Sequence, residues 1–219
     1  EFLVIVSPTL STCASVPITL VFVFLVGLVL NFGVKTLLID PIDIHLYQHL
    51  KSRNEVDDVT TSLWRDCLYK RFNSDIHVVK EDEIMKQCWI CDTEVADHSM
   101  HCRFCNKCVY HFDHHCMWVN TCIGQANYLL FFRLMLALFA MEVYHFGIQL
   151  YLVIDIFLGG PSKDRADKLD AEAVAGILIF FICFNVMALF LIGQLLLFHV
   201  NLQRQKLTTY EFIVQDHKR

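Results

Sequence analysis

The feature that most constrains this chain is a pair of long apolar stretches without a single charged residue. Residues 16–34 and 173–200 carry no Asp, Glu, Lys or Arg, and neither presents a polar face that water could solvate. A helix rises about 1.5 Å per residue, so each stretch is long enough to cross a hydrocarbon layer of about 30 Å. We therefore predict transmembrane helices over residues 16–39 and 173–201, rather than helices buried in a soluble core.

A third apolar stretch, residues 126–158, is also predicted to cross the membrane, although it contains ionisable residues. Glu142 and His145 lie three positions apart, so they share one face of a helix. Ionisable groups in a bilayer face protein or a water-filled cavity. A soluble amphipathic helix is the alternative. Residues 1–15 are too short to span, and we interpret them as the remnant of an earlier span or loop.

Composition and charge agree with a multi-span membrane protein. The 219 residues are 55% hydrophobic and 19% charged, which is less charge than the roughly 25% of a soluble domain. The formal net charge of −5 argues against a nucleic-acid partner. Basic residues gather in residues 40–125 and in the tail 202–219, whereas three basic residues in 159–172 are matched by three aspartates. The positive-inside rule therefore predicts a cytosolic linker (40–87), cysteine-rich segment (88–125) and tail, with 159–172 as a lumenal loop.

Seven of the ten cysteines lie between Cys88 and Cys122, interleaved with five histidines. Cys-x2-Cys pairs such as Cys88/Cys91 and Cys102/Cys105 are typical of turns in which two thiolates bind one tetrahedral zinc ion. A segment with so few aliphatic residues cannot form its own core, so metal would supply the folding energy. The clustering indicates reduced, metal-binding thiols rather than a disulfide scaffold.

The number of ligands leaves a cysteine to spare. Two zinc ions need eight ligands, and seven cysteines and five histidines are available. At least one cysteine is therefore left over if two or more histidines bind, but the spacing does not say which. An iron–sulfur cluster is disfavoured because no Cys-Pro follows Cys108 at the required distance. A RING-type centre would need a different interleaving, so a purely structural zinc module is the main rival.

The run Asp113-His114-His115-Cys116 adds chemistry that zinc binding alone does not require. A cysteine becomes a nucleophile when its pKa is lowered or a neighbouring base takes its proton. Histidine can be that base, and a carboxylate can fix the imidazole tautomer. All three residue types lie within four positions, shortly before a predicted membrane span. We therefore predict a nucleophilic cysteine near the membrane surface.

These motifs resemble the DHHC family of protein S-acyltransferases, the palmitoyltransferases, over about residues 17–215. The matching pattern from Cys88 to Cys122 is Cys-x2-Cys, x9-His-Cys-x2-Cys-x2-Cys, x4-Asp-His-His-Cys and x5-Cys. Further matches are Asn127-x3-Phe131, the TTxE motif at Thr208-Thr209-Tyr210-Glu211, and Asp40-Pro41-Ile42-Asp43, which looks like the Asp-Pro-x-Asp branch of the family.

The resemblance implies a role for each of these residues. Cys116 would be the acylated nucleophile, His114 its base and Asp113 the group that orients the imidazole. Thr209 would hydrogen-bond near Asp113, with Thr208, Glu211 and Asn127 as supporting residues. One zinc ion would be bound by Cys88, Cys91, His101 and Cys108, and a second by Cys102, Cys105, His115 and Cys122.

The resemblance also implies the fold and the function. The fold would be an α-helical polytopic membrane protein, a transmembrane helix bundle with a cytosolic zinc-binding cysteine-rich domain. The protein would transfer a long-chain acyl group from acyl-CoA to Cys116 and then to cysteines of membrane-associated substrate proteins, in the endoplasmic reticulum or Golgi or at the plasma membrane. Family members have four spans, of which three are complete here, and Met117 replaces the usual proline. The alternative is a catalytically inactive, membrane-anchored zinc scaffold or adaptor.

Overall fold

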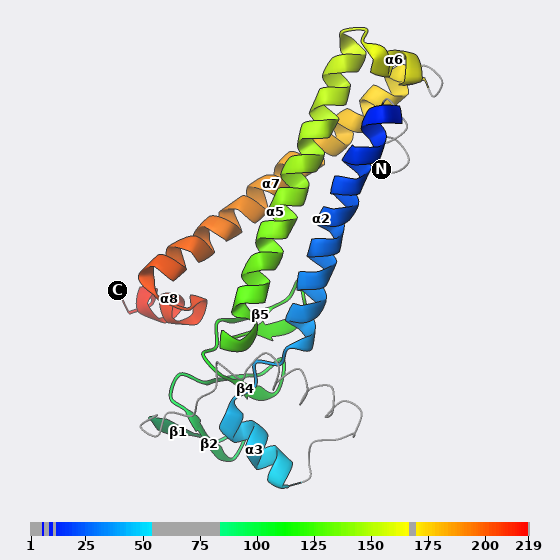
Figure 1. The fold of residues 1–219 in the computed structure, drawn as a ribbon. Helices are drawn as coiled ribbons and strands as arrows, with labels where there is room; N and C mark the ends of the chain where they lie inside the picture. The colour runs from blue at the N-terminus through cyan, green and yellow to red at the C-terminus, as the bar shows by residue number, and fades with distance from the viewer. Residues whose placement is uncertain (1–5, 7–8, 11, 54–83, 167–169, 219) are drawn as a thin grey trace. The chain divides into compact units, whose positions relative to one another are not determined.

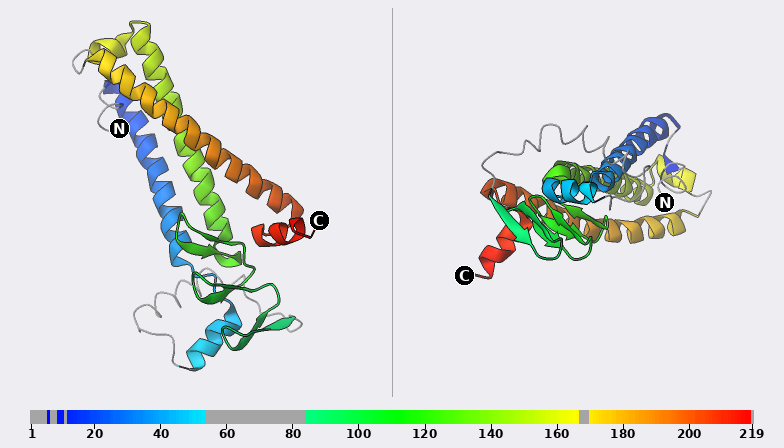
Figure 2. Two further views of the ribbon diagram at one scale, coloured as in Figure 1. Left: turned by 180° about the vertical axis from the view of Figure 1, so that it is seen from behind. Right: turned by 90° about the horizontal axis from the view of Figure 1, so that it is seen from below.

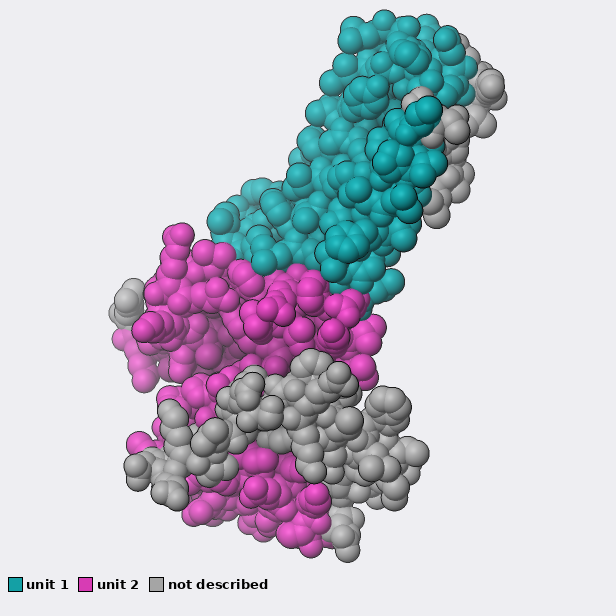
Figure 3. All heavy atoms as spheres, viewed as in Figure 1, with its two compact units in different colours: residues 1–30, 134–198 teal, residues 31–133, 199–219 magenta. Residues whose placement is uncertain are grey.

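The structure is a computed structural model, and it describes residues 6, 9–10, 12–53, 84–166 and 170–218. Its helices are α2 (Thr12–Leu38), α3 (Ile44–Ser52), α5 (Gln125–Phe157), α6 (Pro161–Ala166), α7 (Ala171–Gln205) and α8 (Thr209–Asp216) (Figure 1). Its strands are β1 (Met85–Cys88), β2 (Thr93–Ala96), β3 (Met100–Cys102), β4 (Lys107–Val109), β5 (His114–Cys116) and β6 (Thr121–Ile123). The chain divides into two compact units: unit 1 contains Glu1–Leu30 and Leu134–Phe198, and unit 2 contains Asn31–Arg133 and His199–Arg219 (Figure 3).

Three helices within the described residues are long and apolar enough to cross a membrane. They are Cys13–Leu38, Gln125–Phe157 and Ala171–Gln205, and the mean hydropathies of their apolar 18-residue segments are 2.6, 1.6 and 2.7. Each corresponds to one of the predicted spans, and α7 continues past residue 201 because the polar residues that follow still favour a helix. The predicted fold class, a helical multi-span membrane protein with a cysteine-rich metal-binding domain, is confirmed.

Unit 1 is built from apolar helix faces and a few polar contacts inside the membrane. Its core is formed by buried residues of α5, α6 and α7 with Val6 and Leu10. The Tyr144 hydroxyl donates a hydrogen bond to the Ile18 carbonyl oxygen over 2.8 Å. The ionisable Glu142 accepts one from the Asn185 amide of α7 over 2.5 Å. Such pairing reduces the cost of placing polar groups in a bilayer.

Unit 2 contains three antiparallel two-stranded hairpins, β1–β2, β3–β4 and β5–β6, with no larger sheet among the described strands. Figure 2 shows these green hairpins gathered together, with the cyan α3 beside them. Asp92 and Asn106 follow the second cysteine of each Cys-x2-Cys pair and have positive φ values of 51° and 49°. Short Asp and Asn side chains tolerate this left-handed conformation, so both turns are built in the same way.

Asn127, on the first turn of α5, joins a membrane helix to the cysteine-rich domain. Its buried amide nitrogen donates to the carbonyl oxygens of Thr36, Ile39 and Cys122, at 3.2, 3.3 and 2.9 Å. Its side-chain oxygen accepts from the Gly124 backbone N–H at 3.0 Å. A Cβ at Gly124 would lie 2.7 Å from the Tyr110 carbonyl oxygen, so only glycine fits at this junction.

Asp43 forms a second buried joint in unit 2. One carboxylate oxygen caps the N-terminus of α3 by accepting from the backbone N–H groups of His45 and Leu46, at 2.8 and 3.2 Å. The other oxygen accepts from the Ala96 N–H and the Ser99 hydroxyl, at 3.1 and 2.5 Å. A fully buried carboxylate needs several donors to offset its lost hydration. Asp43 therefore attaches α3 to the β1–β2 hairpin.

Candidate metal centres and active site

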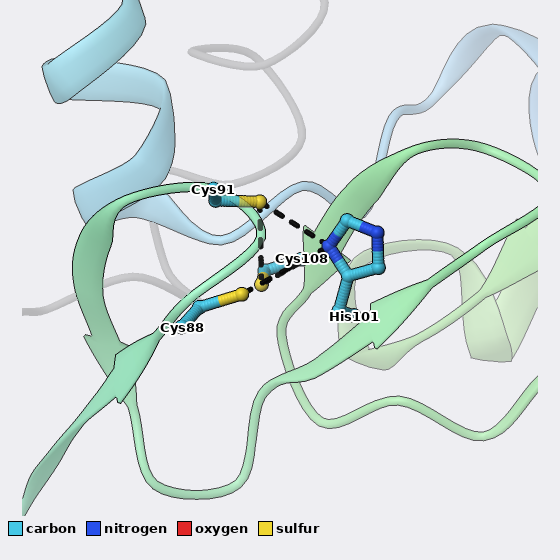
Figure 4. Close-up of side chains that lie close together, drawn as sticks. All are labelled: Cys88, Cys91, His101 and Cys108. Atoms are coloured by element: carbon cyan, nitrogen blue, oxygen red, sulfur yellow. Dashed lines mark hydrogen bonds between the residues drawn. The ribbon is translucent and has the colours of Figure 1, made fainter.

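The first metal-type cluster brings together Cys88, Cys91, His101 and Cys108 from the β1–β2 and β3–β4 hairpins. Figure 4 shows the three sulfur atoms grouped around the Nδ1 atom of His101. The Sγ–Nδ1 distances are 3.9, 3.2 and 4.0 Å for Cys88, Cys91 and Cys108, and the Cys91 and Cys108 sulfurs are 3.8 Å apart. Four ligands around zinc, at bonds of about 2.3 Å, would lie about 3.8 Å from one another. The spacing therefore fits one tetrahedral ion.

The second cluster repeats this arrangement with Cys102, Cys105, His115 and Cys122, from the β3–β4 and β5–β6 hairpins. The three sulfurs lie 3.8, 3.3 and 3.6 Å from the His115 Nδ1 atom, in that order. The Cys105 and Cys122 sulfurs are 3.3 Å apart. In each cluster the histidine and the last cysteine are paired across a hairpin, His101 with Cys108 and His115 with Cys122.

The electrostatics of both clusters also suit a bound cation. Burial, with the neighbouring thiols, raises the pKa of Cys108 and of Cys122. Several thiolates this close together would repel one another, which keeps the thiols protonated. A bound dication displaces these protons and offsets the repulsion between the thiolates. Three thiolates and one imidazole are soft donors that select zinc over calcium or magnesium. Both donor sets thus fit a structural zinc ion, and they are the two sets that the resemblance implied.

Asp113 and His114 form the centre of a third constellation, outside the clusters. The Asp113 carboxylate is 2% exposed, and its Oδ2 atom lies 2.6 Å from the His114 Nδ1 atom. Burial would raise the pKa of Asp113, but hydrogen bonds from His114 and Thr209 outweigh it and lower that pKa. Burial would likewise lower the pKa of His114, but its bonds with Asp113 and Cys116 raise it to about 9.

The cysteine-rich segment has seven cysteines, all of them among the described residues, and Cys116 is the one that belongs to neither cluster. It ends β5, opposite Thr121 of β6, and its residue is 5% exposed. Burial would raise the pKa of its thiol, but the interaction with His114, with help from backbone N–H groups, lowers it. A lowered thiol pKa beside a raised imidazole pKa favours the thiolate–imidazolium form, which is the form of an activated cysteine.

The TTxE motif reaches the same centre from the end of the described chain. Thr209, the first residue of α8, donates to Asp113 twice: from its backbone N–H to Oδ1 at 2.9 Å and from its hydroxyl to Oδ2 at 2.7 Å. Thr208 caps α8, and its capping box with Glu211 fixes the helix start. Asp113 is thus held by Thr209 while it holds His114.

Phe131 and His199 pack against His114, and Tyr128 contacts His199; the sequence did not assign any of the three to the site. Phe131 packs edge-on against the His114 ring with centroids 5.3 Å apart, and the buried His199 lies 5.9 Å from it. The Tyr128 hydroxyl is 3.1 Å from the His199 Nδ1 atom. For His199, the signal in the sequence is a histidine inside an otherwise uncharged span, which by itself indicates only a hydrogen-bonded interior residue.

Fold and site together define a class: a membrane protein with two four-ligand metal clusters beside a cysteine–histidine–aspartate trio. The family model described as DHHC palmitoyltransferase matches residues 81–216. The chain belongs to the DHHC palmitoyltransferase family, as its motifs predicted.

Curated plant proteins are also similar to this chain. Protein S-acyltransferase 18 of Arabidopsis thaliana is 40% identical over 141 residues, covering 62% of this chain and 28% of that protein. Probable protein S-acyltransferase 19 of Arabidopsis thaliana is 32% identical over 158 residues, covering 69% of this chain and 22% of that protein. The chain therefore spans less than a third of the length of these relatives.

Proposed function

We propose that this protein is a protein S-acyltransferase. It moves a long-chain acyl group such as palmitoyl from acyl-CoA to Cys116, and then to cysteine thiols of membrane-associated proteins. The observation that carries this proposal is the position of Cys116, which interacts with His114, itself hydrogen-bonded to Asp113, but belongs to neither metal-type cluster. A scaffold would need the clusters but would not need a separate cysteine with a lowered thiol pKa.

In the first half-reaction, the Cys116 thiolate attacks the carbonyl carbon of acyl-CoA. A new carbon–sulfur bond forms to Cys116, the bond to the CoA sulfur breaks, and the His114 imidazolium gives its proton to the departing thiolate. Asp113 keeps the imidazole oriented and stabilises its charged form, as expected from its 2.6 Å contact with Nδ1.

In the second half-reaction, neutral His114 takes the proton of a substrate thiol. The resulting thiolate attacks the acyl group on Cys116, and Cys116 leaves as the thiolate that began the cycle. The same imidazole serves both steps because the exchange is a thioester for a thioester. No net proton is taken up or released by the protein.

Zinc in the two clusters would have a structural role: it would cross-link hairpins that have little apolar core of their own. The ion at Cys102, Cys105, His115 and Cys122 would fix β5 and β6, and β5 carries His114 and Cys116. The chain's own residues then supply all of the acyl-transfer chemistry.

The membrane spans would hold the acyl chain and place the reaction at the cytosolic surface. Each buried CH2 contributes about 0.8 kcal/mol, so a long chain is bound strongly there.

CoA phosphates would meet the cations Lys35, Arg133, Arg204 and Lys206, which all belong to unit 2. Neutralising all four should raise the KM for acyl-CoA, and an unchanged KM would refute this contact. The positive-inside rule supports a cytosolic cysteine-rich domain, in an endomembrane or the plasma membrane.

The test is covalent labelling of the purified protein with palmitoyl-CoA that carries a detectable tag. Wild-type protein should acquire a label that hydroxylamine removes, because a thioester is cleaved by this nucleophile. Cys116→Ser should abolish the label, whereas Cys183→Ser, a cysteine of α7 outside the site, should not. A label that persists in Cys116→Ser contradicts the proposed nucleophile. A wild-type protein that holds zinc but takes no label would favour the scaffold.

A further inference from the structure

Two aromatic rings, those of Phe131 and His199, pack against the His114 imidazole at the centre of the site. Phe131 meets both His114 and His199 edge-on, at centroid distances of 5.3 Å and angles of 68° and 72°. His199 and His114 face each other at 44°, with centroids 5.9 Å apart. Phe131 comes from the start of α5 and His199 from the end of α7, so two membrane helices meet at this imidazole within unit 2.

His199 is itself oriented by a neighbour. Its Nδ1 atom shares a hydrogen bond of 3.1 Å with the Tyr128 hydroxyl, and the His199 residue is 2% exposed. Tyr128 and Phe131 are three positions apart on α5 and therefore project from one helix face. A buried imidazole in a membrane segment is costly unless it is hydrogen-bonded, and Tyr128 supplies a partner.

The contacts of His114 with Asp113 leave one degree of freedom open. Asp113 holds the Nδ1 corner of the ring, but a hydrogen bond at one corner does not stop the ring plane from tilting. Tilting would carry the opposite nitrogen away from Cys116. Packing against the ring limits this motion, and the neighbouring rings of Phe131 and His199 supply it.

We propose that His199, held by Tyr128, is a positioning residue that fixes the His114 imidazole against Cys116, an inference that rests on the proposed acyl transfer. His199 acts through His114 by packing and exchanges no proton with the substrate. Its contribution should appear in the rate of acyl-enzyme formation rather than in the affinity for acyl-CoA. A misplacement of about 1 Å can cost a reaction about a hundredfold.

The experiment compares variants of the purified protein in lipid vesicles, measuring kcat and KM for acyl-enzyme formation with palmitoyl-CoA. His199→Ala removes the packing surface and should lower kcat about tenfold or more with KM nearly unchanged. The double variant Tyr128→Phe with His199→Phe removes both polar groups but keeps two rings, so it should recover most of the lost rate. Tyr144→Phe is the matched control, since it deletes another hydrogen-bonded hydroxyl of α5 in unit 1 and should leave kcat unchanged.

Each outcome decides the inference. A His199→Ala protein with wild-type kcat overturns it. A double variant that keeps its zinc but is as slow as His199→Ala also overturns it, because the imidazole nitrogens would then be required. Loss of zinc from His199→Ala would show a general structural role and refute specific positioning. A wild-type protein that forms no acyl-enzyme would instead refute the proposed function.

Discussion

The two metal-type clusters have the same ligands, three cysteines and one histidine, but their surroundings differ. The first cluster adjoins an apolar patch in which Cys108 packs with Ile42, Leu46 and Val95, so it lies against α3. In the second cluster, His115 stands between His114 and Cys116 on β5. The first cluster thus helps to attach α3 to the cysteine-rich domain, and we call this the anchor side of the molecule. The second cluster shares a three-residue strand with the proposed reacting groups, and we call this the reacting side.

This difference shows how a repeated module can serve two purposes. The turns after Cys91 and Cys105 use the same left-handed geometry at Asp92 and Asn106. What differs is the partner hairpin: the first cluster joins β1–β2 to β3–β4, and the second joins β3–β4 to β5–β6. Four predictions separate the two roles.

Removing metal from both clusters should have the largest effect. A strong chelator should release about two zinc ions per chain, because each cluster offers one tetrahedral set. Acyl-enzyme formation should be lost completely, since apparent zinc-binding energies of about 10–16 kcal/mol are also folding energy in such domains. Metal analysis and acyl labelling on the same sample test this, with the helical circular dichroism of the spans expected to survive. Full labelling of zinc-free protein would contradict a structural role for the clusters.

Breaking one cluster at a time compares them directly. Cys91→Ser and Cys105→Ser are matched, because each cysteine is the second of its pair and lies 3.2 or 3.3 Å from its cluster's histidine. Each variant should lose about one zinc ion. Cys105→Ser should slow acyl-enzyme formation about a hundredfold, because it frees the strand that carries His114 and Cys116.

Cys91→Ser should slow it about tenfold or less. Equal losses in the two variants would show that the clusters act as one unit, and a larger loss in Cys91→Ser would reverse the comparison.

The contact between α8 and Asp113 tests the reacting side of the molecule more finely. Thr209→Val removes the hydroxyl that donates to Asp113 over 2.7 Å but keeps the backbone donor and the side-chain shape. A hydrogen bond to a charged group is worth about 1.5–3 kcal/mol, so kcat should fall at least about tenfold. Thr209→Ser keeps the hydroxyl, so its kcat should stay close to that of the wild type. The rate of acyl-enzyme formation in both variants is measured from labelling reactions stopped at successive times. A Ser variant as slow as the Val variant would argue against the hydrogen bond.

The anchor side should show the smallest effect on activity. The buried Asp43 carboxylate accepts hydrogen bonds from backbone N–H groups and a hydroxyl. Asp43→Asn replaces one of its acceptor oxygens by an NH2 group, which sets donor against donor. Unfolding should become easier by about 1–3 kcal/mol, while acyl-enzyme formation at low temperature changes less than about threefold. Thermal unfolding and labelling are measured together, with Asp92→Asn at an exposed turn as the control. A large loss of activity without loss of stability would contradict the assignment of Asp43 to the anchor.

Much of this molecule could be predicted from local sequence properties. The absence of charge in residues 16–34 and 173–200 was enough to predict membrane helices, because neither stretch offers a polar face to water. The Cys-x2-Cys pairs indicated metal, and the count of ligands left at least one cysteine to spare if two or more histidines bind. The division of ligands between two ions needed the family resemblance, since spacing alone does not say which hairpins meet.

The surroundings of His114 could not be predicted in this way. Thr209 was expected near Asp113 only through the TTxE motif, which lies 96 positions further along the chain. His199 and Tyr128 are 71 positions apart, and only the tertiary fold brings them together. In the sequence His199 has no distinctive neighbours, so the sequence alone indicates no more than an ordinary interior histidine.

The central claim is that Cys116 carries the acyl group while its neighbouring cysteines bind metal. The most direct measurement is site mapping by mass spectrometry of the two-zinc protein after reaction with palmitoyl-CoA, with unreacted thiols alkylated before digestion. The account predicts one palmitoyl thioester, on Cys116, with the eight cluster ligands unmodified. A palmitoyl group on a cluster cysteine, or a Cys116 that neither acylates nor alkylates because it binds zinc, would contradict the account.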